Sequence, residues 1–192
     1  MKTENVNLSK LGYCDTAAVL NYVDKRLFRQ MAEFVVLSDN ETPIGDVGTP
    51  NAKSRYMSEF LDKNITQIES DDFNFDQIAI PPWKFNTILC FEVIEHLQNP
   101  LFFIKQLKDM LWSGGTIYLS TPCRPQFLWT EHHFIEYSPA RLKKWILEPL
   151  GLQIVRKKYL HINHHWSFYI KGFRPIFRLF LGWTVIYELK KR

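Results

Sequence analysis

Cysteine is scarce in this sequence of 192 residues, and long apolar runs are missing from it. The three cysteines, Cys14, Cys90 and Cys123, show no CxxC spacing, which argues against a disulfide framework and indicates a reducing compartment. The N-terminal residues lack the apolar segment of a signal peptide. The longest apolar run, near Phe180 to Tyr187, is far shorter than the ~20 residues that span a bilayer. We therefore expect a cytoplasmic protein without a membrane-spanning helix.

Acidic residues are nearly absent from the C-terminal end. Residues 156–192 hold nine Lys or Arg and a single acid, Glu188, for a net charge of +8, whereas the remaining residues sum to −4. Such asymmetry is typical of an end that meets an anionic surface or substrate. A solvated basic face is the commoner explanation when charge is the only observation, so both interpretations stay open.

Strand and helix patterns alternate from about residue 43 to residue 160. Hydrophobic residues make up 46% of the chain, enough for one globular core. The alternation predicts an α/β fold: a Rossmann-like, mostly parallel sheet with helices on both faces. Two late strands with no regular helix signal between them predict an antiparallel pair at the sheet edge. We expect a single domain over 1–192, with a helical region at 1–40, a core at 41–160 and an insertion at 161–182 before the last strand.

Local signals define the expected elements. Asp15 or Thr16 can cap a first helix, while Asn99-Pro100 and Ser138-Pro139 are start signals for two later helices. Gly114 and Gly115 are expected to end the helix that begins at Pro100. The predicted helices are 15–38, 54–63, 101–112 and 140–151, and the predicted strands are 42–47, 65–69, 86–91, 116–120, 152–160 and 183–191.

The first strand leads into a turn that is short of glycine. Asp46 and Gly48 suit a nucleotide-binding turn, but Pro50 and Ala52 follow where further glycines are usual. Glu69 lies 23 residues after Asp46, at the end of the second strand, where a carboxylate can accept both ribose hydroxyls. The acids beside Glu69 also fit an ordinary polar loop.

Two further clusters follow predicted strands. Glu92, Glu95 and His96 share one face if their turn is helical, and could then ligate a metal or hold a base. Hydrogen bonds that only cap and orient the loop are the alternative. The loop between Pro122 and Ser138 is long for a compact domain, and one of its histidines could face this cluster. That loop carries Arg124, His132 and His133.

The segment "FNTILCFEVIEHLQNPLFFIKQLKDMLWSGGTIYLSTP" resembles class I S-adenosylmethionine-dependent methyltransferases. It is most similar to the small methyltransferases of the ubiquinone-pathway O-methyltransferase type, and "HHFIEYSPARLKKWILEPLGLQIV" is similar to their next segment. The first loop departs from the family pattern at Pro50 and Ala52. The resemblance implies S-adenosylmethionine as cofactor and a set of cofactor-binding residues: Asp46, Gly48, Glu69, Asp72, Phe73, Asn74, Phe91 and Glu92.

A metal site is implied by a similarity to small-RNA 2′-O-methyltransferases, in which two glutamates and two histidines hold a divalent ion. The matching residues here are Glu92, Glu95, His96 and, by its His-Phe-x-Glu setting, His133. Two carboxylates and two imidazoles suit Mg²⁺, Mn²⁺ or Zn²⁺. Without a metal, His133 or Glu92 is the candidate catalytic base.

The resemblance implies O-methylation of a small molecule, sugar or lipid-linked acceptor. The alternative is a catalytically inactive methyltransferase-like binding or scaffold protein that has lost its cofactor loop. For residues 161–182, rich in aromatic and basic side chains, we rank a lid over the substrate mouth first. Peripheral contact with an anionic membrane ranks second and nucleic acid third. Neither the methyl acceptor nor the oligomeric state follows from the sequence.

Overall fold

A computed structural model describes residues 20–37, 43–48, 50–69, 78, 81–161, 168, 170 and 172–191, without the side chain of Arg174. These residues form a six-stranded sheet in the order β2-β1-β3-β4-β6-β5. The strands are β1 Ile44–Val47, β2 Ile65–Ile68, β3 Phe85–Phe91, β4 Leu111–Pro122, β5 Leu152–His161 and β6 Trp183–Lys191. The helices are α1 Tyr22–Phe34, α2 Ala52–Leu61, α3 Pro100–Asp109, α4 Pro139–Leu142 and α6 Phe173–Leu181.

The sheet is parallel at one side and antiparallel at the other. Strands β2, β1, β3 and β4 run in parallel, whereas β6 is antiparallel to both β4 and β5. The predicted α/β class, the mostly parallel sheet and the antiparallel edge pair are therefore confirmed. From β1 the chain goes first to β2 on one side and then to β3 on the other, so the strand order reverses between β1 and β3. Ligands of such sheets bind beyond the carboxyl ends of the strands at this reversal.

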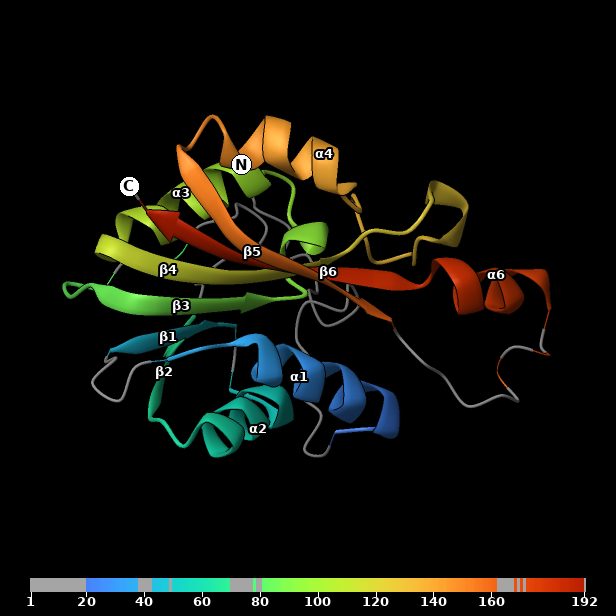
Figure 1. The fold of residues 1–192 in the computed structure, drawn as a ribbon, viewed down its shortest axis with the longest axis horizontal. Coiled ribbons are helices and arrows are strands. Elements are labelled where there is room, and N and C mark those ends of the chain that lie inside the picture. The colour runs from blue at the N-terminus through green and yellow to red at the C-terminus, as the bar shows by residue number, and fades with distance from the viewer. Residues whose placement is uncertain are drawn as a thin grey trace, which may run out of the picture.

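Two apolar cores cover the two faces of the sheet. Helices α1 and α2 lie on one face, and α3 and α4 on the other (Figure 1). Met31 of α1 and Met57 of α2 pack in one core with Leu89 and Tyr118, and Phe103 and Ile104 of α3 pack in the other with Ile88. Because alternate residues of β3 point to opposite faces, one strand supplies both cores, which explains its continuous apolar run.

The capping signals of the middle helices act as predicted. The Asn99 side chain accepts a hydrogen bond from the backbone N–H of Phe102, with Pro100 in the first turn of α3. Ser138 caps α4 in the same way, and α4 continues into a wider turn at Lys143–Leu147. Cys90 and Cys123 are free thiols, and Cys14 lies outside the described residues.

Several boundaries were predicted wrongly. Helix α1 begins at Tyr22 with Asn21 as its cap, so neither Asp15 nor Thr16 caps it. Helix α3 ends at Asp109, before the two glycines, because Leu111 already pairs with Phe85 in the sheet. Gly114, with φ 75°, instead lies within β4 near a register shift.

The insertion before the last strand holds a helix, which the sequence interpretation missed. Helix α6 spans Phe173–Leu181 and extends past the end of the sheet in Figure 1. Pro175 near its start is compatible with a first helical turn, and Gly182 follows its end. None of the described helices is both long and apolar enough to cross a bilayer.

Candidate active site

The first loop joins β1 to the start of α2. Asp46 is buried at the end of β1 and accepts a hydrogen bond from Gln67 Nε2 at 3.3 Å. Burial raises the pKa of Asp46 to about 6, although hydrogen bonds from Ser54 and Gln67 act in the opposite direction. Asn51 caps α2 by accepting from the backbone N–H groups of Lys53 and Ser54. A capped helix thus begins where the family pattern has its further glycines.

Gly48 has φ 130°, a conformation that side chains with a Cβ rarely adopt. A Cβ added there would meet no atom within 4 Å, so the backbone at Gly48 borders open space. Its N–H donates to Ile68 O at 3.1 Å, which holds the ends of β1 and β2 together. Glu69, exposed immediately after β2, consequently lies at the same edge, as predicted. Residues 72–74, predicted to bind the cofactor, lie outside the described residues.

Glu92 has a left-handed backbone, with φ 55°. Its carboxylate accepts from Ser120 Oγ at 2.8 Å, and its N–H donates to Ser120 O at 3.2 Å. Burial raises the pKa of Glu92 to about 7, against the hydrogen bond from Ser120. The helical turn that follows begins only at Ile94. The expectation that Glu92, Glu95 and His96 share one helical face is therefore wrong, since the backbone turns between Glu92 and the other two.

Glu95 is fully buried under the loop that follows β4. Thr121 Oγ1 donates to its Oε2 at 3.2 Å, and its backbone carbonyl accepts from the N–H of Phe134 at 2.8 Å. Its other carboxylate oxygen, Oε1, has no hydrogen-bond partner among the described residues. Burial, reinforced by the nearby Glu92, holds the pKa of Glu95 well above its ordinary value. A buried oxygen without a partner is costly and points to a missing ligand or proton.

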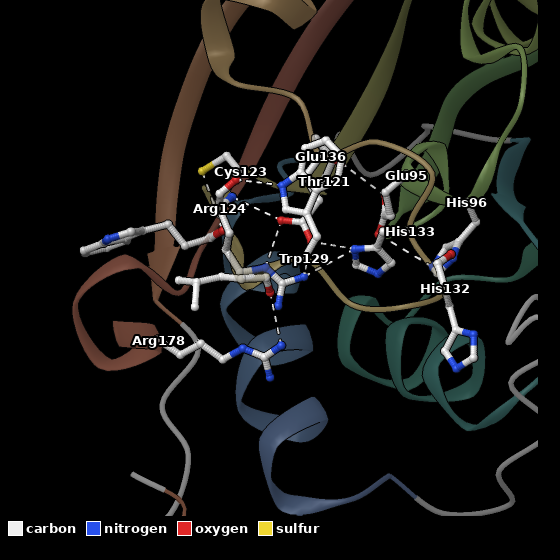
Figure 2. A network of polar contacts seen from close by, with 12 residues as sticks. Glu95, His96, Thr121, Cys123, Arg124, Trp129, His132, His133, Glu136 and Arg178 are labelled. Atoms are coloured by element: carbon white, nitrogen blue, oxygen red, sulfur yellow. Dashed lines mark hydrogen bonds and ion pairs between the residues drawn. The ribbon is translucent and has the colours of Figure 1, made fainter. Parts of the chain in front are cut away.

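Glu95, His96 and His133 come together, each with one ligand atom within 4.8 Å of the other two (Figure 2). The two imidazole rings meet edge to face, with centroids 4.7 Å apart. His96 Nδ1 lies 2.9 Å from His132 O, and burial lowers the pKa of His96 to about 4. Three of the four predicted metal ligands thus form a group, and Glu92 is not part of it.

Behind His133 lies a buried ionic network that the sequence interpretation did not assign to the site. Figure 2 shows Arg124 and His133 converging on Glu136. Arg124 Nε donates to Glu136 Oε2 at 2.9 Å and Nη2 donates to Oε1, while His133 Nδ1 lies 2.7 Å from the same Oε1. Burial would raise the pKa of Glu136, but hydrogen bonds from His133 and Arg124 hold it below its ordinary value. The three-residue spacing of His133 and Glu136 was visible in the sequence, whereas the burial of Glu136 was not.

Residues 14–172 match the family described as methyltransferase domain. The chain belongs to this family.

Curated relatives of this methyltransferase domain include two ubiquinone biosynthesis O-methyltransferases. The one from Actinobacillus pleuropneumoniae serotype 5b (strain L20) is 30% identical over 126 residues, which cover 66% of this chain and 45% of the relative. The one from Histophilus somni (strain 2336) is 28% identical over 105 residues, 55% of this chain and 37% of the relative. The methyltransferase domain thus spans less than half of either relative.

Solved structures share the fold at low identity. A SAM-dependent methyltransferase from Archaeoglobus fulgidus superposes with a TM-score of 0.59 at 11% identity, covering 88% of this chain and 94% of that one. Coclaurine N-methyltransferase, bound to N-methylheliamine and SAH, superposes with a TM-score of 0.59 at 12% identity, covering 90% of this chain and 74% of that one. The [4+2]-cyclase SpnF also superposes, with a TM-score of 0.57 at 12% identity, covering 96% and 92%. The fold alone therefore does not identify the reaction, which has to be inferred from the residues of the site.

The family implies S-adenosylmethionine as cofactor, and several residues of the methyltransferase domain could hold it. The open space beside Gly48 and the exposed carboxylate of Glu69 lie at the carboxyl ends of β1 and β2, next to the point where the strand order reverses. Pro50 and Asn51 are not glycines, so within the described part of this loop only Gly48 allows a ligand to approach the backbone closely.

Proposed function

We propose that this chain is an S-adenosylmethionine-dependent O-methyltransferase that acts on a hydroxyl of a small molecule, sugar or lipid-linked acceptor. The observation that carries the proposal is the group formed by Glu95, His96 and His133 beside the strand-order reversal. It offers neutral imidazole and a buried carboxylate where an acceptor oxygen would meet the cofactor. The O-methyltransferase relatives support oxygen as the acceptor atom.

Methyl transfer needs an oxygen nucleophile in line with the methyl carbon and the sulfonium sulfur. The oxygen–carbon bond forms as the carbon–sulfur bond breaks, S-adenosylhomocysteine leaves, and the hydroxyl proton passes to a base. His133 is the better candidate for the base, because Glu136 holds its Nδ1 and leaves Nε2 for proton transfer. Glu92, with a pKa near 7, is the second candidate.

A divalent cation fits the same group. Glu95 Oε1 is buried without a hydrogen-bond partner in the described part of the chain, although His96 Nε2 lies 3.9 Å from it. His96 is neutral at pH 7 because burial lowers its pKa. A carboxylate behind one imidazole and a backbone carbonyl behind the other are usual supports of metal-bound histidines. Glu95, His96 and His133 would hold the ion, and Mn²⁺ or Zn²⁺ suits this ligand set better than a hard ion that prefers oxygen alone. A bound ion would polarise the acceptor hydroxyl and lower its pKa.

One observation favours a second function, that of an inactive binding or scaffold protein. The first loop runs through Pro50 into a helix capped by Asn51, without the glycines that let a backbone approach S-adenosylmethionine closely. Such a protein would keep the fold and lose the cofactor. The two functions differ in whether S-adenosylhomocysteine is produced.

Turnover can be tested without knowing the acceptor. The protein is incubated with S-adenosylmethionine and separate lipid, saccharide and small-molecule extracts, with and without Mn²⁺, and S-adenosylhomocysteine is quantified. We expect one extract to raise its production in wild type and not in Glu95→Gln/His133→Ala. The matched control is His132→Ala, because the His132 side chain is exposed beside the same site. Equal, background production in every extract and in all variants would contradict the proposal.

A further inference from the structure

Helix α6 carries an exposed apolar strip made of Phe173, Ile176 and Phe180. Their i, i+3 and i+7 spacing places them along one side of the helix. The residues are 81%, 44% and 65% exposed, respectively. Contiguous apolar surface of this kind marks an interaction site more often than chance exposure does.

Contacts at the edge of the strip, by Phe177, and on the opposite side of α6, by Arg178, hold the helix against the turn at Gln126–Leu128. Phe177 packs edge to face on Phe127, with ring centroids 5.6 Å apart, and Arg178 Nη2 donates to Leu128 O at 3.1 Å. At the end of the helix, a Cβ on Gly182 would lie 2.3 Å from Arg178 O, so only glycine permits this tight connection to β6. A lid would bury its apolar side against the site, whereas here Phe173 and Phe180 remain in solvent.

The charge of the segment that contains the strip indicates what kind of partner would bind there. Residues 161–187 contain three basic residues, Lys171, Arg174 and Arg178, and no acidic residue. Glu188, the next acid along the chain, is paired with Arg156. A segment that combines exposed phenylalanine with an excess of basic over acidic residues in its sequence is complementary to an anionic lipid interface.

We propose that α6 docks this protein on the surface of an anionic membrane, with Phe173 and Phe180 inserted at the level of the headgroups and upper acyl chains. Nine residues make a helix of about 13 Å, which can lie in the interface but not cross it. The turn at Gln126–Leu128 that holds α6 belongs to the same loop as Arg124 and His133. Docking therefore brings the mouth of the site close to the lipid headgroups, whether or not the chain transfers methyl groups.

Vesicle co-sedimentation tests the proposal. Wild type is mixed with vesicles of phosphatidylcholine alone or with phosphatidylglycerol, at low and high salt. We expect binding to the anionic vesicles alone, weakened by salt because the basic residues contribute. Phe173→Ser/Phe180→Ser should lower the vesicle affinity about ten-fold or more. Trp145→Ser is the matched control, because Trp145 is also 65% exposed but lies on the turn after α4.

Three results would overturn the proposal. Wild type could remain in the supernatant with anionic vesicles at low salt. The double variant could bind them as wild type does, although both phenylalanines are exposed and their replacement should leave the fold intact by circular dichroism. Wild type could form a dimer and bind no vesicles while the double variant is a monomer, which would make the strip a protein interface.

Discussion

His133 Nδ1 lies 2.7 Å from Glu136 Oε1, and Glu136 is buried. Arg124 Nη2, which can only donate, lies 3.3 Å from the same Nδ1, but the carboxylate, which can only accept, is closer. The shorter contact favours the tautomer with the hydrogen on Nδ1, in which the neutral imidazole keeps its lone pair on Nε2. Hydrogen bonds from His133 and Arg124 hold the pKa of Glu136 below its ordinary value, which keeps the carboxylate ionised. Both candidate roles of His133, metal ligand and base, need this tautomer.

Glu136→Gln tests this arrangement, since an amide can also donate to Nδ1 and so permits the opposite tautomer. We expect ¹⁵N NMR of the histidine side chains to show mainly the Nδ1–H form of His133 in wild type and a mixture in the variant. Metal affinity or activity should fall about 10- to 100-fold, as for other carboxylates that support a ligating histidine. An unchanged tautomer in a folded variant would show that Glu136 only balances Arg124.

The proposed cation site predicts a binding signal that does not depend on turnover. Calorimetry of the chelator-treated protein with Mn²⁺ or Zn²⁺ should show one site, which Glu95→Gln and His96→Ala each remove. His132→Ala should retain it, because His132 supports His96 only through its backbone carbonyl. Methyl transfer should stop in EDTA and return with metal. Full activity in excess chelator would exclude the metal and leave His133 or Glu92 as the base.

Asp46 predicts a pH-dependent stability. Its pKa is about 6 in the folded protein against 3.8 for the ordinary group, so the folded state holds the proton more tightly than the unfolded state does. As pH rises from about 4 to 6, stability is lost, and above pH 6 the cost approaches roughly 3 kcal/mol. Asp46→Asn removes this cost while keeping a side chain that can accept from Gln67.

Thermal unfolding across pH provides the measurement. The melting temperature of Asp46→Asn minus that of wild type should be largest at pH 8 and should shrink below pH 5. Asp109→Asn, at an exposed ion pair with Lys105, is the control and should change little at any pH. A difference independent of pH would mean that burial does not raise the pKa of Asp46.

The sequence predicted the parts of this structure that local chemistry determines. Asn99-Pro100 and Ser138-Pro139 start helices because the cap and the fixed proline φ act within one turn. The early start of β4 was missed because Leu111 is drawn into the sheet by Phe85, a residue distant in sequence. Glu136 was missed for a similar reason, since its role depends on burial beside Arg124. Residue types gave Glu95 and His96, and the resemblance to small-RNA 2′-O-methyltransferases gave His133. The left-handed backbone that separates Glu92 from them had no sequence signal.

Substitutions of Gly48 and Glu69 test the predicted cofactor site. Gly48→Ala places a Cβ in open space but forces a residue with a side chain into φ 130°, so it should cost about 1–2 kcal/mol of stability and weaken cofactor binding. Glu69→Gln should weaken cofactor binding with little loss of stability, because Glu69 is exposed. Glu59→Gln, exposed on α2, should change neither property. Equal affinity in wild type and Glu69→Gln would remove Glu69 from the cofactor site.

Calorimetric titration of the wild-type protein with S-adenosylmethionine and S-adenosylhomocysteine is the most direct test of the central claim. We expect saturable one-site binding of both compounds, weakened in Glu69→Gln and unchanged in Glu59→Gln. Absence of heat and of any thermal shift with either compound, at high protein concentration, would contradict it and leave a methyltransferase fold that has lost its cofactor.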